Sequence, residues 1–420
     1  MCSNGNRKIF RASSRIYTNG FLRRVNTLKF EWLKDPGPQA LFSCFRGKAE
    51  IRFVGGCVRN SLLGIALKDD FDLAISCPPD LTMRFLQESN ILSIPTGIKH
   101  GTISAIVEGI LYEITTLRTE CNHDGRHASV EFTHDWAGDA ARRDFTMNAL
   151  YVDEQGKIFD TVQGQEDLAQ GIVRFIGDPD ARIQEDYLRI LRFFRIHAYY
   201  GKGDLNTQDF SSCCRWKHML SILSKERITK EFFKLLEAPN PWYVIEKMIS
   251  SGILSQILQT RLSFVSTEEL EQCSGYNPGP LVRWATLTEY PCPGLRLSKK
   301  QERTFSALHI PLNFQHIKES LYAQDVSIVL GRCWLTCVKN FKNSKTQFLE
   351  NWCQYSEQIS SFVPVFFPLN GNVLLDNGVT SQHIGKILNH VKQWWIKHDE
   401  KPSSLECLAY ALNIEKTMLK

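Results

Sequence analysis

One stretch, residues 51–75 (IRFVGGCVRNSLLGIALKDDFDLAI), restricts the possible folds of this chain more than any other. It begins with an apolar run over residues 51–54, which stops at a glycine pair and is followed by helix-forming residues 58–63. A second apolar run then carries Asp70 and Asp72. The stretch therefore predicts a strand, a tight turn, a short helix and a second strand.

The residue types in this stretch suit a triphosphate and its metal ions. A glycine pair lets the backbone approach a ligand closely because no Cβ stands in the way, and the first N–H groups of a helix attract phosphate. Gly56 and Arg59, whose planar fork can hold phosphate oxygens, are therefore candidate nucleotide ligands. Side chains alternate along a strand, so Asp70 and Asp72 are expected on one face, where paired carboxylates suit two Mg²⁺ ions in nucleotidyl transfer.

The combination GGxVRxxLLG…DxD resembles the signature of a nucleotidyltransferase family, the class II group that includes tRNA CCA-adding enzymes and bacterial poly(A) polymerases. The resemblance continues through RRDFTMNAL at residues 142–150 and EDYLRILRFFR at residues 185–195. One departure is Asn60, where the family usually has an aspartate, although asparagine can still hydrogen-bond locally. The resemblance implies an α+β chain, with a small mixed α/β nucleotidyltransferase head followed by an all-helical neck, body and tail.

A carboxylate outside the first motif is a candidate third metal ligand. Residues 101–107 and 110–117 are predicted to be two strands of a hairpin around a Glu-Gly pair. Glu113 lies in the second strand, and a third carboxylate near the metals is common in this chemistry. An ion pair between Glu113 and Arg118 is an equal alternative.

The polar segment of residues 118–129 (RTECNHDGRHAS) is predicted to be a loop that joins two strands and can move. The resemblance implies that its DGRH residues form a flexible element that reorients during nucleotide addition. Asp124 and Arg126 are therefore candidate functional residues. The histidines in and near this segment are more typical of a solvated loop than of a metal site.

The segment RRDFTMNA offers contacts to the rest of the nucleotide. Arg143 can reach a triphosphate, whereas Asp144 and Asn148 can hydrogen-bond a ribose hydroxyl, the group that distinguishes ribonucleotides from deoxyribonucleotides. Taken alone, Arg142 and Asp144 could simply pair across the end of a helix. Within the family pattern, Arg143 is interpreted as a ligand contact.

Four charged residues are predicted to select the base. Asp186, Arg189, Arg192 and Arg195 are spaced by three, so each is expected beside the next on one helix. Without the neighbouring motifs, a solvated ladder of ion pairs would be the better interpretation. Cytosine and adenine both present an amino donor beside a ring-nitrogen acceptor, which Asp186 and Arg189 complement. Guanine and uracil present the reverse pattern, and a hydrogen-bonding site can reject such analogues by ~10⁴-fold or more. Arg192 and Arg195 would hold this pair or the phosphates, and the resemblance implies the same assignment.

Beyond residue 201 the sequence is dominated by helical periodicity, which prolines interrupt. We therefore expect a basic leader and lead-in helix over residues 1–47, the catalytic head over residues 48–160, and a helical neck with the base-selection helix over residues 161–240. Residues 241–420 are expected to form a helical body and tail. The resemblance implies that the tail binds tRNA.

Composition limits the compartment and the partners. The net charge of +5 is mild and suits an RNA partner only if the positive charge is clustered. Thirteen cysteines without a CxxC pair favour free thiols in a reducing compartment, and no segment is apolar enough to span a membrane. The protein is therefore expected in the cytoplasm. Residues 1–30 contain seven Lys or Arg and no acid, so an organellar transit peptide is an alternative, beside a disordered basic arm or an imperfectly assigned start.

The motifs and the resemblance together imply a template-independent CTP/ATP:tRNA nucleotidyltransferase that builds or repairs the 3′-terminal CCA of tRNA. Its cofactor would be Mg²⁺ and its partners tRNA, CTP and ATP, with no membrane. A poly(A) polymerase, or an enzyme that adds only CC or only A, shares all of these motifs and is an alternative. A non-catalytic RNA-binding protein and a small-molecule nucleotidyltransferase are alternatives of other classes.

Overall fold

The computed structural model describes residues 27–67, 70–123, 128–259, 262, 266–288, 293–341 and 344–418. The chain divides into two compact units. The first unit consists of residues 1–143 and 147–164, and the second unit consists of residues 144–146 and 165–420. The finer division into leader, head, neck, and body with tail stays a prediction.

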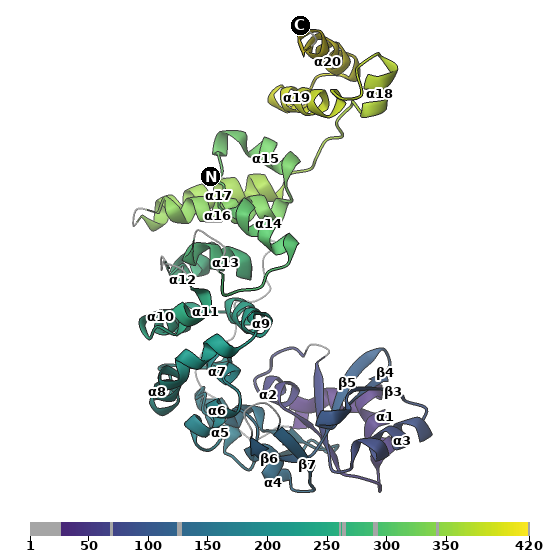
Figure 1. Ribbon diagram of the computed structural model, residues 1–420, viewed down its shortest axis with the longest axis vertical. Coiled ribbons are helices and arrows are strands. Elements are labelled where there is room, and N and C mark those ends of the chain that lie inside the picture. Colours follow the sequence, from purple (N-terminus) through teal and green to yellow (C-terminus); the bar gives the residue numbers. More distant parts are fainter. Residues whose placement is uncertain are drawn as a thin grey trace, which may run out of the picture. The chain divides into compact units, whose positions relative to one another are not determined.

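A seven-stranded sheet forms the centre of the first unit, with the strand order β3-β4-β5-β2-β1-β8-β9 (Figure 1). Strands β2 and β5 run parallel, and the other neighbouring strands are antiparallel. The predicted strand–turn–helix–strand stretch and the predicted hairpin are both confirmed, as β1-α2-β2 and β4–β5. The placement of Asp70 on the second strand is wrong, because β2 begins one residue later. The strands of this sheet are β1 (Ile51–Val54), β2 (Phe71–Ile75), β3 (Leu92–Gly97), β4 (Thr102–Val107), β5 (Ile110–Thr116), β8 (Tyr151–Val152) and β9 (Ile158–Phe159).

An aromatic core fixes which face of the central strand carries its carboxylate. The ring centroids of Trp32 and Phe53 lie 4.7 Å apart, and the rings of Phe71 and Tyr112 stack at 5.3 Å. Because Phe71 points into this core, Asp72 lies on the opposite face of β2. The helical segments of this unit are η1 (a 3-10 helix, Thr27–Lys34), α1 (Pro36–Phe45), α2 (Gly56–Leu62), α3 (Pro79–Glu88), η2 (Ile98–His100) and α4 (Trp136–Ala141), and η3 (Thr146–Asn148) crosses the boundary between the units.

The prediction of a loop over residues 118–129 is largely wrong. Strands β6 (Arg118–His123) and β7 (Ala128–Phe132) pair as a separate antiparallel ribbon. The β6 segment (RTECNH) carries only one apolar residue, Cys121, so it lacks the alternation of apolar and polar side chains that marks a strand in the sequence. Asp124 and Arg126 lie outside the described residues, so their predicted role stays a prediction.

The second unit is built from helices, as the sequence predicts (Figure 1). No helix in the described ranges combines the length and the apolar content that a bilayer crossing needs. The helices in chain order are α5 (Gly164–Gln170), α6 (Pro179–Glu185), α7 (Leu188–Tyr200), α8 (Thr207–Trp216), η4 (Lys217–Ile222), α9 (Lys225–Leu236), α10 (Trp242–Ser250), α11 (Ile253–Leu258), α12 (Glu268–Ser274), α13 (Pro280–Leu287), α14 (Lys299–Leu308), η5 (Phe314–His316), α15 (Ile317–Ala323), α16 (Val326–Lys339), α17 (Lys345–Ser360), α18 (Gly371–Asp376), α19 (Ile384–Lys397) and α20 (Ser404–Met418).

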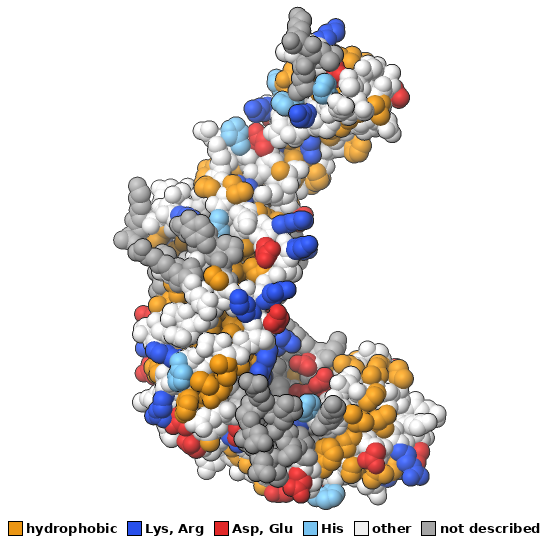
Figure 2. All heavy atoms as spheres, in the orientation of Figure 1, with side chains coloured by type: hydrophobic (Ala, Val, Ile, Leu, Met, Phe, Trp, Pro, Cys, Tyr) orange, Lys and Arg blue, Asp and Glu red, His pale blue; other side chains and the backbone are white. Residues whose placement is uncertain are grey.

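A shallow basic groove lies between α9 and the segment that leads into α14. Its volume is about 440 Å³, and its cations are Lys230, Lys234 and Arg296. Glu226 and Glu237 line the same groove, so its charge is mixed with a positive excess. Figure 2 shows Lys and Arg side chains gathered on this side of α9 and α14. Clustered positive charge of this kind suits a polyanion.

A buried arginine ties three helices of the second unit together. The side chain of Arg283, on α13, donates to the backbone oxygens of Leu236 at 2.6 Å and Ala238 at 2.7 Å. It also forms an ion pair of 2.7 Å with Glu271 on α12, and only 2% of the arginine is exposed. One side chain therefore donates hydrogen bonds to the free backbone oxygens at the end of α9 and also pairs with a buried carboxylate.

Replacing Arg283 with methionine is expected to lower the free energy of unfolding of the second unit by about 3–5 kcal/mol, because it leaves the Glu271 carboxylate buried without its partner. Urea unfolding followed by tryptophan fluorescence measures this, since Trp284 lies next in the chain. Lys345→Met, which removes the exposed ion pair with Glu269, is the control and should not move the midpoint. An unchanged midpoint for Arg283→Met would show that this network does not stabilise the fold.

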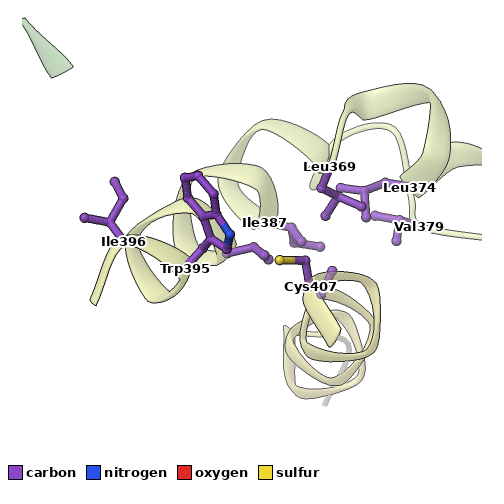
Figure 3. Packing of buried hydrophobic residues seen from close by; sticks show 9 residues of the cluster. Leu369, Leu374, Val379, Ile387, Trp395, Ile396 and Cys407 are labelled. Atoms are coloured by element: carbon purple, nitrogen blue, oxygen red, sulfur yellow. The ribbon is translucent and has the colours of Figure 1, made fainter. Parts of the chain in front are cut away.

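The C-terminal helices enclose a hydrophobic cluster of their own (Figure 3). The indole of Trp395 lies in this cluster, and its Nε1 donates to the backbone oxygen of Pro402 at 3.1 Å. The helices α18, α19 and α20 therefore pack around a shared interior. The buried members of the cluster are Leu369, Leu374, Val379, Ile387, Val391, Trp395, Ile396, Cys407 and Ala411.

Candidate active site

The glycine turn lies directly against the Asp72 carboxylate. Gly55 caps α2 with φ +78° and ψ −125°, a conformation that a residue with a Cβ rarely adopts. A Cβ at this position would lie 3.9 Å from Asp72 Oδ2 and 3.7 Å from the backbone oxygen of Asn148. The turn after β1 and the carboxylate on β2 therefore border the same space, as the sequence predicts from the motif.

Three carboxylates of the first unit gather around β2. Asp72 is half-buried on β2, Asp70 is exposed just before this strand, and Glu113 on β5 is in register with Asp72. Burial, followed by the charges of Asp70 and Glu113, raises the pKa of Asp72 to about 6, and Arg143 opposes the shift. Within the described residues, no group of three or more His, Cys, Asp or Glu side chains meets the geometry of a metal site. Glu113 contributes a negative charge that acts on Asp72.

Arg59 and Asn148, predicted separately as triphosphate and ribose contacts, lie together. The guanidinium of Arg59 donates to the side-chain oxygen of Asn148 and, from Nη2, to Asn60 Oδ1 at 3.2 Å. Only 7% of Arg59 is exposed. Asn60, which departs from the family pattern, therefore still supplies an oxygen that orients the arginine.

Arg143 is fixed by two residues that the sequence did not single out. Its Nη2 donates to Asp139 at 3.1 Å and its Nε to the Tyr151 hydroxyl at 2.9 Å, and this hydroxyl donates to Asp139 at 2.7 Å. Burial alone would lower the pKa of Arg143, but the combined effect of Tyr151 and Asp139 is larger and raises this pKa above its ordinary value. Asp139 also pairs with Arg142, so one buried carboxylate holds two consecutive arginines. The spacing of Asp139 and Arg143 by four in the sequence could have revealed this pair, although α4 ends at Ala141.

In the second unit, the prediction that one helix carries Asp186 and the three arginines is wrong. Helix α6 ends at Glu185, Asp186 is extended at φ −154° and ψ 104°, and α7 begins at Leu188. Asp186 Oδ1 accepts a hydrogen bond of 3.1 Å from the backbone N–H of Leu188, so the carboxylate satisfies one free N–H in the first turn of α7. The Asp186 side chain thus precedes the helix that carries Arg189.

The four residues do not neighbour one another as predicted, because each arginine pairs with an acid that is not on α7. Arg189 pairs with Glu185 and donates to the backbone oxygen of Arg182 at 2.7 Å. Arg192 donates from Nε to Asp144 at 2.9 Å, and Arg195 donates to Glu231 on α9 at 2.6 Å. Asp186 itself pairs with Arg227 on α9 at 2.7 Å. Spacing along one helix cannot reveal partners on other elements.

Arg192 and the ribose candidate Asp144 form a half-buried pair. Asp144 is 8% exposed, and its charge, acting against burial, raises the pKa of Arg192. The structure therefore brings Asp144 together with Arg192, and it brings Asn148 together with Arg59. The carboxylates around β2 belong to the first unit, and the residues predicted to select the base belong to the second unit.

The similarity of this chain to known sequences extends over nearly its whole length. Residues 51–174 match the family described as "Poly A polymerase head domain", and residues 207–261 match the family described as "Probable RNA and SrmB- binding site of polymerase A". The chain is 31% identical over 420 residues to the human protein "CCA tRNA nucleotidyltransferase 1, mitochondrial", and this alignment covers 94% of each of the two chains. It is 36% identical over 230 residues to the "CCA-adding enzyme" of Geobacillus sp. (strain WCH70), which covers 54% of this chain and 55% of that protein.

Two solved structures have a similar fold. The CCA-adding enzyme of Bacillus stearothermophilus in complex with CTP matches with a TM-score of 0.70 and 22% identity, over 91% of this chain and 99% of that chain. The Thermotoga maritima CCA-adding enzyme complexed with tRNA matches with a TM-score of 0.61 and 18% identity, over 93% and 98%. The arrangement of a mixed sheet unit followed by helices is therefore shared with both.

Proposed function

The chain belongs to the nucleotidyltransferase family of CCA-adding enzymes and poly(A) polymerases, and we propose that it adds the 3′-terminal CCA to tRNA with CTP and ATP as substrates. The observation that carries this function is the identity of 31% with a CCA tRNA nucleotidyltransferase over 94% of both chains. The acidic group around β2 and the charged pair at the start of α7 supply the chemistry that this activity needs.

We propose that Asp70 and Asp72 hold Mg²⁺, with Glu113 as a further candidate ligand. Three carboxylates opposed by one arginine leave an excess of negative charge around Asp72, and this fits bound divalent cations. When bound there, such cations would help the 3′-hydroxyl of tRNA to lose its proton and would neutralise charge on the triphosphate. Arg59, Arg143 and the turn at Gly56 would orient the triphosphate.

The charged pair of the second unit would read the base without a template. The Asp186 carboxylate accepts from the amino group of cytosine or adenine, and the Arg189 guanidinium donates to the ring nitrogen. Guanine and uracil would meet a repulsive or unpaired contact at each position. Arg192 and Arg195 support this arrangement through their own ion pairs, and Asp144 and Asn148 are the ribose candidates.

Incubating the protein with tRNA that lacks CCA, and with CTP and ATP separately and together, tests the function. Addition that stops after three nucleotides supports CCA synthesis, whereas a growing tail indicates a poly(A) polymerase. A product from only one nucleotide indicates a CC-adding or an A-adding enzyme. Chelation with EDTA should stop the reaction and Mg²⁺ should restore it. No pyrophosphate release under any of these conditions would favour a non-catalytic RNA-binding protein.

We propose that the basic groove along α9 contacts the tRNA backbone, since its three cations line one surface of the second unit. Replacing Lys230 and Lys234 together with alanine is expected to weaken tRNA binding about tenfold at low salt and to flatten its dependence on salt. Filter binding over a series of salt concentrations measures both. Lys48→Ala, which changes an exposed lysine of the first unit, is the control. Identical affinities and salt slopes would remove the groove from the tRNA interface.

For localisation, we infer that the organellar alternative deserves the first test, because the human relative is named as mitochondrial. Residues 1–26 lie outside the described residues, so the argument for a transit peptide rests on the composition of residues 1–30 alone. A fusion of residues 1–30 to a fluorescent protein should reach mitochondria. Retention of the fusion in the cytoplasm would favour the original expectation.

A further inference from the structure

Arg52 projects from the face of the sheet that carries Asp72. Strand β1 is in register with both β2 and β8, and its residue Val54 is paired with Asp72 on one side and with Tyr151 on the other. Directly paired residues point to the same side of a sheet, and Arg52 lies two residues before Val54 on β1. The side chains of Arg52, Asp72 and Tyr151 therefore share one face.

Two aromatic rings enclose the guanidinium of Arg52. Its central carbon, Cζ, lies 3.9 Å from the centre of the Trp136 ring and 3.6 Å from the centre of the Phe159 ring. Glu50 completes the arrangement, because its Oε2 accepts from Arg52 Nη2 and from Trp136 Nε1, each at 3.0 Å. The Arg52 side chain is only 13% exposed. A planar cation held between two rings and a carboxylate has little freedom to turn.

Trp136 connects this arrangement to Arg143, which is proposed to bind the triphosphate. It is the first residue of α4, and Asp139 follows one turn later on the same helix. The Trp136 ring also meets the Tyr151 ring edge-on, with 5.5 Å between the two centroids. Asp139 and Tyr151 are the two residues that hold the guanidinium of Arg143. A fixed Trp136 therefore keeps both partners of Arg143 in place.

We propose that Arg52 is a positioning residue for the triphosphate, which holds the first turn of α4 through Trp136 and so keeps Arg143 directed at the space beside Asp72. This inference rests on the proposed function, because it concerns the same triphosphate contact. The charge of Arg143 opposes the rise in the pKa of Asp72, so its guanidinium already acts on the proposed metal site. Arg52 is itself engaged by Glu50 and the two rings, and its effect on the nucleotide passes through Arg143.

The first experiment compares Arg52→Met with Arg84→Met in the full chain. Methionine leaves a long apolar side chain between the rings and removes the cation and its bond to Glu50. The KM for CTP and ATP should rise about five- to tenfold, because Arg143 loses its fixed direction. Inhibition by CMP, which lacks the β- and γ-phosphates, should stay within about twofold, since the base and the ribose are held elsewhere.

Arg84→Met is a matched control, since Arg84 lies on α3 in the same unit, pairs with Glu88 and is 71% exposed. It should change neither the KM for the triphosphates nor the inhibition by CMP. An unchanged KM in Arg52→Met, or an equal weakening of CMP and CTP, overturns the inference. If the unchanged protein adds neither C nor A to tRNA, the proposed function fails instead.

The second experiment tests whether Arg52 acts through Arg143. In an Arg143→Gln background, Arg52→Met should raise the KM for CTP no further, whereas independent effects would multiply. Arg52→Lys keeps a cation between the rings and should stay within about threefold of the unchanged protein. Multiplied effects, or a lysine variant as impaired as the methionine variant, would contradict a positioning role.

Trp136→Phe decides the question if urea unfolding shows that Arg52→Met does not fold. This variant keeps a ring over Arg52 and removes the Nε1–H that binds Glu50. The KM for CTP should rise about threefold, in the same direction as for Arg52→Met, with inhibition by CMP unchanged. A KM equal to that of the unchanged protein would show that this arrangement does not orient Arg143.

Discussion

Replacing Asp72 with asparagine is expected to reduce the addition of both C and A to tRNA by ~10³-fold or more, because Asp72 is proposed to hold the metal ions that each step needs. The substitution keeps the size of the side chain beside Gly55 and removes only its charge. The loss should therefore appear in kcat, and tRNA affinity should change little. Pyrophosphate release with CTP or with ATP measures the chemistry, and filter binding measures the affinity.

The control for this experiment is Asp80→Asn. Asp80 is an exposed aspartate in the first turn of α3, a helix outside the β1-α2-β2 stretch. It should retain full activity. Turnover retained by Asp72→Asn, or an equal loss in Asp80→Asn, would contradict the assignment of Asp72 as a metal ligand.

Replacing Arg189 with glutamine is expected to lower the preference for CTP and ATP over UTP and GTP by ~10²-fold or more. A guanidinium can only donate, whereas the glutamine amide can either donate or accept. It can therefore meet the ring N–H of uracil or guanine as well as the ring nitrogen of cytosine or adenine. Glu185 keeps its ion pair with Arg182, so the start of α7 should remain folded.

Steady-state kinetics with each of the four nucleotides measures this preference. Arg174→Gln is the control, since it removes the ion pair between Arg174 and Asp167 in the same unit. The single change is cleaner than exchanging Asp186 and Arg189. That exchange would place an arginine beside Arg227 and a carboxylate beside Glu185, and would add two repulsions. A preference that stays unchanged in Arg189→Gln would remove the hydrogen-bond account of base choice.

The sequence predicts those parts of the fold whose signals are local. The β1-α2-β2 stretch is bounded by glycines and carries a clear apolar pattern, so its elements and the position of Asp72 beside the turn are confirmed. The hairpin β4–β5 has the same kind of signal. The helical second unit follows from periodicity alone. In each case, the residues that determine the element lie within the element.

Features that depend on partners distant in the sequence could not be predicted. The break at Asp186 is stabilised by its bond to Leu188 and by Arg227, and only the first of these is local. The acids that pair with Arg192 and Arg195 lie 48 and 36 residues away in the chain. Strand β6 escaped prediction because its sequence, RTECNH, is polar except for Cys121, and its pairing with β7 is not visible in either segment alone.

The two bonds made by Asp186 restrict how base choice can change by mutation. The carboxylate that is proposed to contact the base of an incoming nucleotide also accepts the free backbone N–H of Leu188 at the start of α7. Local side-chain bonds of this kind to a backbone N–H two residues later are typical of aspartate, asparagine, serine and threonine. A genetic selection for altered nucleotide preference should therefore recover asparagine at this position far more often than an aliphatic residue. One residue, Asp186, is therefore expected to affect both the choice of base and the local fold at the start of α7.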